Sequence, residues 1–259
     1  MELHEWAKRL LSAETMGEKL LQPEELTDHS PGPKTLWKTP SRPPGMHFQK
    51  RGRKEKLPPL QELTDPDKRA ACLHRFCGHE LLAVEIMAYV LLAFPEAPPL
   101  FRKALAHQLK EEQEHVQLYM DEMQRLGLQF GELPLYTHFW VHTPYIRSPL
   151  HFVSLMNLTF EMANLDFAPI YGRAFEKAGD DSATQLMARI LKDEIGHVRL
   201  GLHWLKKFKS KELSEWDAWK ETLETTLLIP KRAKGFYVHE EPRRKAGVPE
   251  EWIQQLQSL

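Results

Sequence analysis

Hydrophobic positions recur with helical spacing along most of the chain, in blocks that proline and glycine separate. No alternating apolar run is long enough to predict a sheet, and no hairpin signal appears. The pattern predicts an amphipathic N-terminal helix over residues 3–21, then four long helices, then two shorter ones. The predicted fold class is therefore all-α.

Capping signals set the ends of the four long helices. Asp65 followed by Pro66 is an N-cap with proline at the first helical position, and Gly127 is a typical C-terminal cap. Asp180 and Ser214 are further N-cap candidates. The long helices are predicted over 65–94, 98–126, 148–178 and 180–209, and the shorter ones begin near Ser214 and Pro249.

The lengths of the connections predict a topology. The first and second helices, and the third and fourth, are joined by a few residues each, so each pair forms an antiparallel hairpin. About 20 residues separate the second helix from the third, whereas antiparallel neighbours need only about 2 to 8. A crossover along the length of the bundle explains this connection. The prediction is a ferritin-like four-helix bundle with a long second-to-third crossover.

Three segments are expected from these boundaries. Residues 1–64 form the N-terminal helix and a Pro-rich arm, residues 65–210 the bundle, and residues 211–259 a helical extension packed on the bundle. Residues 34–56 of the arm carry eight Lys or Arg and one acid, Glu55. We expect this basic arm to wrap the bundle; binding of RNA or another phosphate-bearing partner is a less favoured alternative.

Charge and cysteine content exclude several classes of protein. Lys and Arg number 35 against 36 Asp and Glu, which argues against bulk attraction to nucleic acid or anionic lipid. The longest uncharged stretch in the most apolar region, 86–95, is too short for a membrane span. The two cysteines, Cys72 and Cys77, cannot form a disulfide framework or a zinc cage alone. We expect a cytoplasmic protein without a membrane partner, in which both cysteines act as small buried hydrophobes.

Two Glu-x-x-His motifs suggest metal chemistry, Glu112–His115 and Glu194–His197. With 27 Glu and 13 His in 259 residues, about one such spacing is expected by chance. The number of motifs is therefore not evidence for a metal site, and only their positions in the predicted helices can be. Glu80 and Glu112 are 16 residues before and after the first hairpin turn. Glu161 and Glu194 lie 17 before and 16 after the second. All four carboxylates are therefore predicted to share one layer of the bundle.

Two alternatives stay open at this stage. Glu85 competes with Glu80 on the first long helix, but it lies about 7.5 Å further along the axis, so Glu80 is preferred. Glu161 is the sole Glu in a nearly apolar segment, and a buried carboxylate must be paired or bind a metal. A polar core network with Arg or His is the alternative to a metal.

Two further acids could orient the imidazoles of the predicted metal ligands. Imidazoles that bind metals usually donate their other N–H to a carboxylate or carbonyl. An acid directly precedes each motif, Glu111 in the first and Asp193 in the second. We predict that Asp193 orients His115 and that Glu111 orients His197.

Four stretches carry a family resemblance: HRFCGHELLAVEIMA, KEEQEHVQLYMDEMQRLG, MNLTFEMANLDFAPIYGRAFEKAGD and ILKDEIGHVRLGLHWL. They resemble an uncharacterised bacterial family of ferritin-like proteins, a domain of unknown function within the rubrerythrin and di-iron carboxylate superfamily. More distantly, the chain is similar to the di-iron hydroxylase that modifies tRNA. The resemblance implies a two-metal site formed by Glu80, Glu112, His115, Glu161, Glu194 and His197.

The function expected from this resemblance is that of an O₂- or peroxide-using oxidoreductase with two metal ions. Iron is the first expectation, and a manganese–iron pair would also fit carboxylate-rich ligands. The alternatives are a non-catalytic metal-binding or iron-handling protein, and a helical interaction module with a vacant polar core. The sequence does not name the small-molecule substrate, the electron donor or the oligomeric state, for which a dimer is one option.

Overall fold

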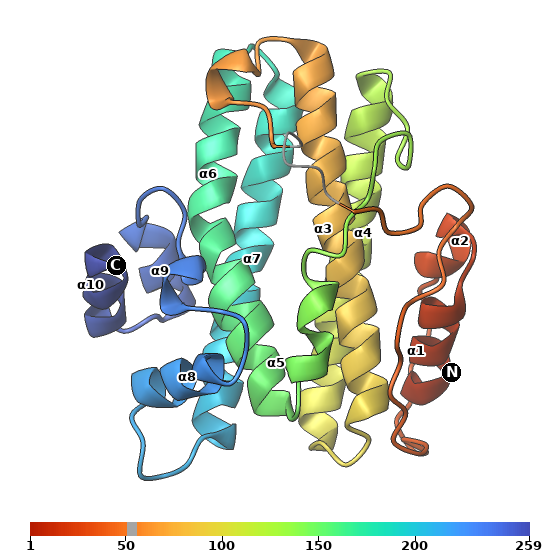
Figure 1. Ribbon diagram of the computed structural model, residues 1–259, viewed down its shortest axis with the longest axis vertical. Coiled ribbons are helices and arrows are strands. Elements are labelled where there is room, and N and C mark those ends of the chain that lie inside the picture. Colours follow the sequence, from red (N-terminus) through yellow and green to blue (C-terminus); the bar gives the residue numbers. More distant parts are fainter. Residues whose placement is uncertain (51–55) are drawn as a thin grey trace. The chain divides into compact units, whose positions relative to one another are not determined.

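The computed structural model describes residues 1–50 and 56–259, and helices make up the regular structure of these residues (Figure 1). Within them the only β-type pairings are isolated bridges, Glu2 with Thr27 and Phe48 with Leu135. The all-α prediction is confirmed. The chain divides into two compact units, Met1–Thr143 and Pro144–Leu259.

The first unit is built around an antiparallel pair of long helices, α3 and α4, which run side by side (Figure 1). The Asp65 carboxylate caps α3 by accepting the Asp67 N–H at 2.9 Å. Gly127 adopts a left-handed conformation (φ +83°) just after α4. These local signals explain why the predicted ends agree with the observed ones. The elements are α1 (Leu3–Ser12), α2 (Met16–Lys19), the 3₁₀ turn η1 (Leu60–Glu62), α3 (Pro66–Ala93) and α4 (Pro99–Arg125).

The N-terminal helix predicted over residues 3–21 is in fact two helices. Helix α1 ends at Ser12, and Thr15 then caps α2 by accepting the Glu18 N–H at 3.2 Å. The prediction of one continuous helix was wrong because the apolar spacing continues across the break. Helix α1 still buries one face, which includes Trp6 and Leu10, against α3.

The arm that follows is extended chain tied to the first unit by backbone hydrogen bonds. Thr35 N–H donates to the Leu92 carbonyl at 2.9 Å, and Gln49 N–H donates to the Leu135 carbonyl at 2.8 Å. These contacts replace the regular pairing that the prolines prevent. Of the basic arm 34–56, residues 51–55 lie outside the described residues.

The second unit contains another antiparallel helix pair, but its first helix is interrupted. The predicted helix 148–178 consists of α5, a π-helical segment η3 and α6, and it pairs with α7. A π-helix holds one extra residue per turn and therefore shifts the faces of the residues after it. The elements are α5 (Pro149–Leu155), η3 (Met156–Glu161), α6 (Met162–Lys177) and α7 (Asp181–Phe208), with the 3₁₀ turn η2 (Trp140–Tyr145) crossing from the first unit.

A hydrogen-bonded contact with the C-terminal region accompanies the π segment. The Thr159 hydroxyl donates to the Ser154 carbonyl at 2.7 Å. The Trp219 indole N–H, from α8 (Glu215–Glu224), reaches the same carbonyl at 3.2 Å and the Thr159 hydroxyl at 3.3 Å. The Trp219 indole thus ties α8 to the start of the π segment.

The rest of the C-terminal extension is fixed to α6 by a buried ion pair. The Asp166 carboxylate contacts both terminal nitrogens of Arg243 and accepts the N–H of Gly235 (2.8 Å) and His239 (2.7 Å). Asp166 and Arg243 are both fully buried. The elements are η4 (Pro230–Ala233), α9 (Glu240–Ala246), which was not predicted, and α10 (Glu250–Ser258).

Among the described residues, α3 is the one helix with the length and hydropathy to cross a membrane. In the structure 89% of its most apolar window is buried inside the protein, as in the core helix of a soluble protein.

Candidate metal centre

The first unit brings together three of the predicted ligands, Glu80 from α3 and Glu112 and His115 from α4. All three are buried, and each offers a ligand atom within 4.8 Å of the others. His115 Nδ1 lies 3.4 Å from Glu112 Oε2, because residues three apart share one face of a helix. We call this cluster the first half-site.

Cys77 lies one helical turn before Glu80. Its thiol contacts the Val116 carbonyl at 3.6 Å. Burial, and secondarily the negative charge of Glu80, raise the pKa of Cys77 well above its ordinary 9.0. Cys77 is thus a protonated, buried thiol, and Cys72 is likewise buried and free.

The second unit carries the other three predicted ligands, Glu161 at the end of η3 and Glu194 and His197 on α7. Their exposed fractions are 4%, 1% and 2%. His197 Nδ1 lies 3.5 Å from Glu194 Oε2, nearly the distance found in the first half-site. Among the described residues, Glu194 Oε2 has no hydrogen-bond donor. We call this cluster the second half-site.

Two asparagines in the second half-site were not predicted. Asn157 Nδ2 donates to Glu161 Oε2 at 2.7 Å and reaches the His197 carbonyl at 3.2 Å. Asn164 Nδ2 donates to Glu194 Oε1, also at 2.7 Å. The available signal was the presence of two amides in an otherwise apolar stretch around Glu161. Each amide fixes one carboxylate oxygen.

Glu85, the rival of Glu80, lies in a different environment. It is completely buried and accepts hydrogen bonds from Lys19 Nζ at 2.9 Å and from Arg42 Nε at 3.2 Å and Nη2 at 2.5 Å. Its charge is balanced by two cations from the N-terminal segment. The structure therefore groups Glu80, and not Glu85, with Glu112 and His115.

The two acids predicted to orient the imidazoles are Glu111, on α4, and Asp193, on α7. Asp193 Oδ2 accepts a hydrogen bond from Arg189 Nε at 2.6 Å within α7. Glu111 is partly exposed on α4. Their orienting roles toward His115 and His197 stay predictions.

The donor set in each half-site suits a divalent transition metal. Carboxylate oxygen and imidazole nitrogen are ligands that iron and manganese accept, whereas the soft thiolates that favour copper(I) are not offered. The buried Glu194 oxygen without a donor is an atom that a cation would satisfy. Buried Glu and His groups in this protein can therefore hold metal ions.

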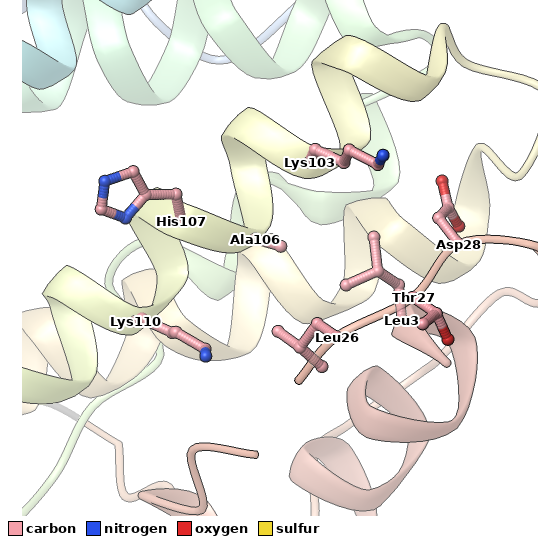
Figure 2. Close-up of a pocket in the computed structure, with 8 residues that line it drawn as sticks. All are labelled: Leu3, Leu26, Thr27, Asp28, Lys103, Ala106, His107 and Lys110. Carbon is pink, nitrogen blue, oxygen red and sulfur yellow. The ribbon is translucent and has the colours of Figure 1, made fainter. Parts of the chain in front are cut away.

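A groove of about 260 Å³ lies elsewhere in the first unit (Figure 2). It runs between α4 and the N-terminal segment, on the side of α4 where Lys103 and His107 are exposed. Its Asp28 carboxylate is held by the Arg102 guanidinium at 2.9 Å. The lining residues are Leu3, Leu26, Thr27, Asp28, Lys103, Ala106, His107 and Lys110.

The chain belongs to a family described as "Protein of unknown function (DUF455)", whose model matches residues 3–254. Over 108 residues the chain is 28% identical to an uncharacterized protein of Haemophilus influenzae. That match covers 39% of this chain and 36% of the relative, so it spans about a third of the relative's length. No solved structure matches the chain.

Proposed function

We propose that the two half-sites are halves of one dinuclear metal centre in a ferritin-like bundle, and that the protein is an O₂- or peroxide-using oxidoreductase. The repeated donor set carries this proposal. Each unit offers one Glu from one helix and a Glu-x-x-His motif from the antiparallel helix, with imidazole-to-carboxylate distances of 3.4 and 3.5 Å. The proposed ligands are Glu80, Glu112, His115, Glu161, Glu194 and His197.

This ligand set has the charge and order of a dinuclear carboxylate site. Four carboxylates carry four negative charges, which two divalent cations neutralise, and in di-iron carboxylate bundles two helices supply Glu and two supply Glu-x-x-His. When bound, two iron ions, or one manganese and one iron, would supply the redox chemistry that amino-acid side chains lack. Small molecules, namely O₂ or peroxide and an organic substrate, are the proposed partners.

The chain's own residues do the positioning. Asn157 and Asn164 each hold one oxygen of a carboxylate, and among the described residues Glu194 Oε2 has no donor and could engage a cation. The two imidazoles direct Nδ1 at the carboxylate of their own motif, and we assign Asp193 and Glu111 to hold their opposite nitrogens. Burial of all six ligands keeps bulk water from the site.

Metal content after anaerobic loading with Fe(II) tests the proposal. The protein should bind two iron ions per chain, and exposure to O₂ should change the optical spectrum. Absence of bound iron would refute the metal site, and iron that does not respond to O₂ or peroxide would favour the non-catalytic, iron-handling alternative.

Single substitutions test whether the half-sites act together. In one shared centre, Glu80→Gln and Glu161→Gln should each weaken binding of both ions. Loss of one ion by each variant, with the other ion bound normally, would instead show two separate mononuclear sites. Glu122→Gln is the matched control, because Glu122 is also buried on α4 but pairs with Arg125 at 2.5 Å. This variant should keep both ions.

A further inference from the structure

A second cavity of about 260 Å³ opens beside the first half of α3, and its lining differs from that of the groove in Figure 2. Three cationic side chains line it, Lys56, Lys68 and Arg75, and none of the described lining residues is a carboxylate. The Figure 2 groove, in contrast, contains the carboxylate of Asp28. The remaining lining residues are Leu57, Pro58, Ala71, His74, Leu133, Pro134 and Tyr136.

One face of α3 forms the floor of this cavity. Lys68, Ala71 and Arg75 lie three and four residues apart and therefore share a face of the helix. The small Ala71 leaves space between two long cationic side chains, which can converge on a ligand above it. Lys68 Nζ is 3.9 Å from the Glu62 carboxylate, but both side chains are about half exposed, so that pair is weak and can be exchanged for a ligand.

Arg75 is the most firmly placed of the three cations. Its guanidinium carbon lies 4.4 Å from the centre of the Tyr136 ring, which orients the planar group. A planar guanidinium held in this way can offer two parallel N–H donors to an oxyanion.

His74 lines the cavity without adding a charge. Its Nε2 accepts the Gly131 N–H at 3.0 Å, so the ring hydrogen resides on Nδ1. Burial, reinforced by the positive charge of Arg75, lowers the pKa of His74 to about 4, which keeps the ring neutral at pH 7.

We propose that this cavity, which we call the α3 cavity, binds a small phosphate monoester. The phosphate, with about two negative charges, lies between Arg75 and Lys68, and the organic group packs against Leu133 and Tyr136. A carboxylate, with one charge, would balance these cations less well. The proposal does not depend on the metal centre.

A smaller cavity continues the α3 cavity along α3. It shares Arg75, Pro134 and Tyr136 with the α3 cavity and is lined further along by His79, the residue before Glu80. Arg75 and Glu80 are five residues apart on α3, about 7.5 Å along the axis.

Isothermal titration of the metal-free protein with phenyl phosphate tests the proposal. Phenyl phosphate should bind at least tenfold more tightly than benzoate, which has the same ring with one charge, and phenol should not bind. Arg75→Ala should weaken binding at least tenfold, because a hydrogen bond to a charged group is lost. Lys68→Ala, at an exposed position that does not endanger folding, should weaken binding severalfold.

Lys103→Ala is the matched control, because Lys103 is an exposed lysine in the other groove. It should leave the affinity unchanged. Equal affinity of Arg75→Ala, Lys68→Ala and the unmodified protein would overturn the proposal, as would equal affinity for benzoate. Binding of an oligonucleotide without terminal phosphate, combined with no binding of phenyl phosphate, would overturn the assignment to a small monoester.

Discussion

Glu85→Gln should destabilise the protein strongly while leaving metal binding intact. The carboxylate is fully buried and is the shared acceptor for Lys19, which is fully buried, and Arg42, which is 2% exposed. The glutamine keeps the size of the side chain but removes its charge. Two buried cations then share a neutral amide, which accepts fewer and weaker hydrogen bonds than a carboxylate.

The size of the effect follows from the loss of one partner in a buried ion network. Removing one partner of such a pair typically costs about 3–5 kcal/mol, because the remaining charge stays buried without compensation. Lys19 limits the cost: burial lowers its pKa and the charge of Glu85 opposes that shift, so without Glu85 the amine loses its proton more readily. We therefore expect about 3 kcal/mol, which is about 6–12 °C in Tm for a chain of this size.

Thermal and urea unfolding, followed by circular dichroism, measure this loss. Glu96→Gln is the control, because Glu96 is exposed in the α3–α4 turn and should change stability by less than about 0.5 kcal/mol. Iron content measured on the same Glu85→Gln preparation should equal that of the unmodified protein. A stability loss below about 1 kcal/mol, or a loss of iron, would refute this assignment of Glu85 and reopen its competition with Glu80.

Two further predictions concern pH and packing. Burial lowers the pKa of His74 from 6.5 to about 4, so the unfolded chain binds this proton more readily than the folded protein does. The neutral, buried His74 therefore contributes fully to the free energy of unfolding above pH 6.5. This contribution is lost as the pH falls toward 4. Urea unfolding at pH 7 and 4.5 should show a loss of about 2–3 kcal/mol that His74→Gln lacks; identical pH dependence in both proteins would contradict this. Gly201→Ala would place a Cβ 2.4 Å from Asn157 Cβ, so it should lower the free energy of unfolding by about 1–3 kcal/mol and weaken metal binding. Gly196→Ala on the same helix is the control. Its Cβ would meet nothing within 4 Å, so it should not destabilise the protein. Equal effects of the two glycine substitutions, in unfolding and metal-binding assays, would exclude this packing argument.

The ends of the long helices could be predicted because their signals are local. Asp65 accepts the N–H of a residue two positions away, and Gly127 needs only its own backbone conformation. The turn positions follow from these ends, and the single layer of four carboxylates expected from them stays a prediction. The three-segment division of the chain is not tested by these features and stays a prediction.

The π segment could not be predicted because its partners are distant. Trp219 contacts Ser154 and Thr159 from 65 and 60 residues away. A helical pattern in the sequence does not distinguish 3.6 from 4.4 residues per turn over six residues. Glu161 is the last residue of the π segment, so the predicted helix still contains it at that position.

The choice between Glu80 and Glu85 also depends on both kinds of contact, those between residues near in sequence and those between residues far apart in sequence. Helical rise alone favoured Glu80, which the structure places beside Glu112 and His115. The positive evidence about Glu85 comes from Lys19 and Arg42, which approach it across 66 and 43 residues of sequence. No spacing rule relates a basic residue in an irregular arm to one carboxylate in a helix.

The distribution of the chain's own cations now gives an argument for the metal centre. Glu85 and Asp166 are completely buried, and each is neutralised by Lys or Arg from an N- or C-terminal segment. Glu194 is also buried. Its contacts among the described residues include the amide of Asn164 and the imidazole of His197, neither of which is a permanent cation. Since an isolated buried carboxylate is costly, a cation from solution would stabilise Glu194. A metal ion would engage Oε2, the oxygen that has no donor among the described residues.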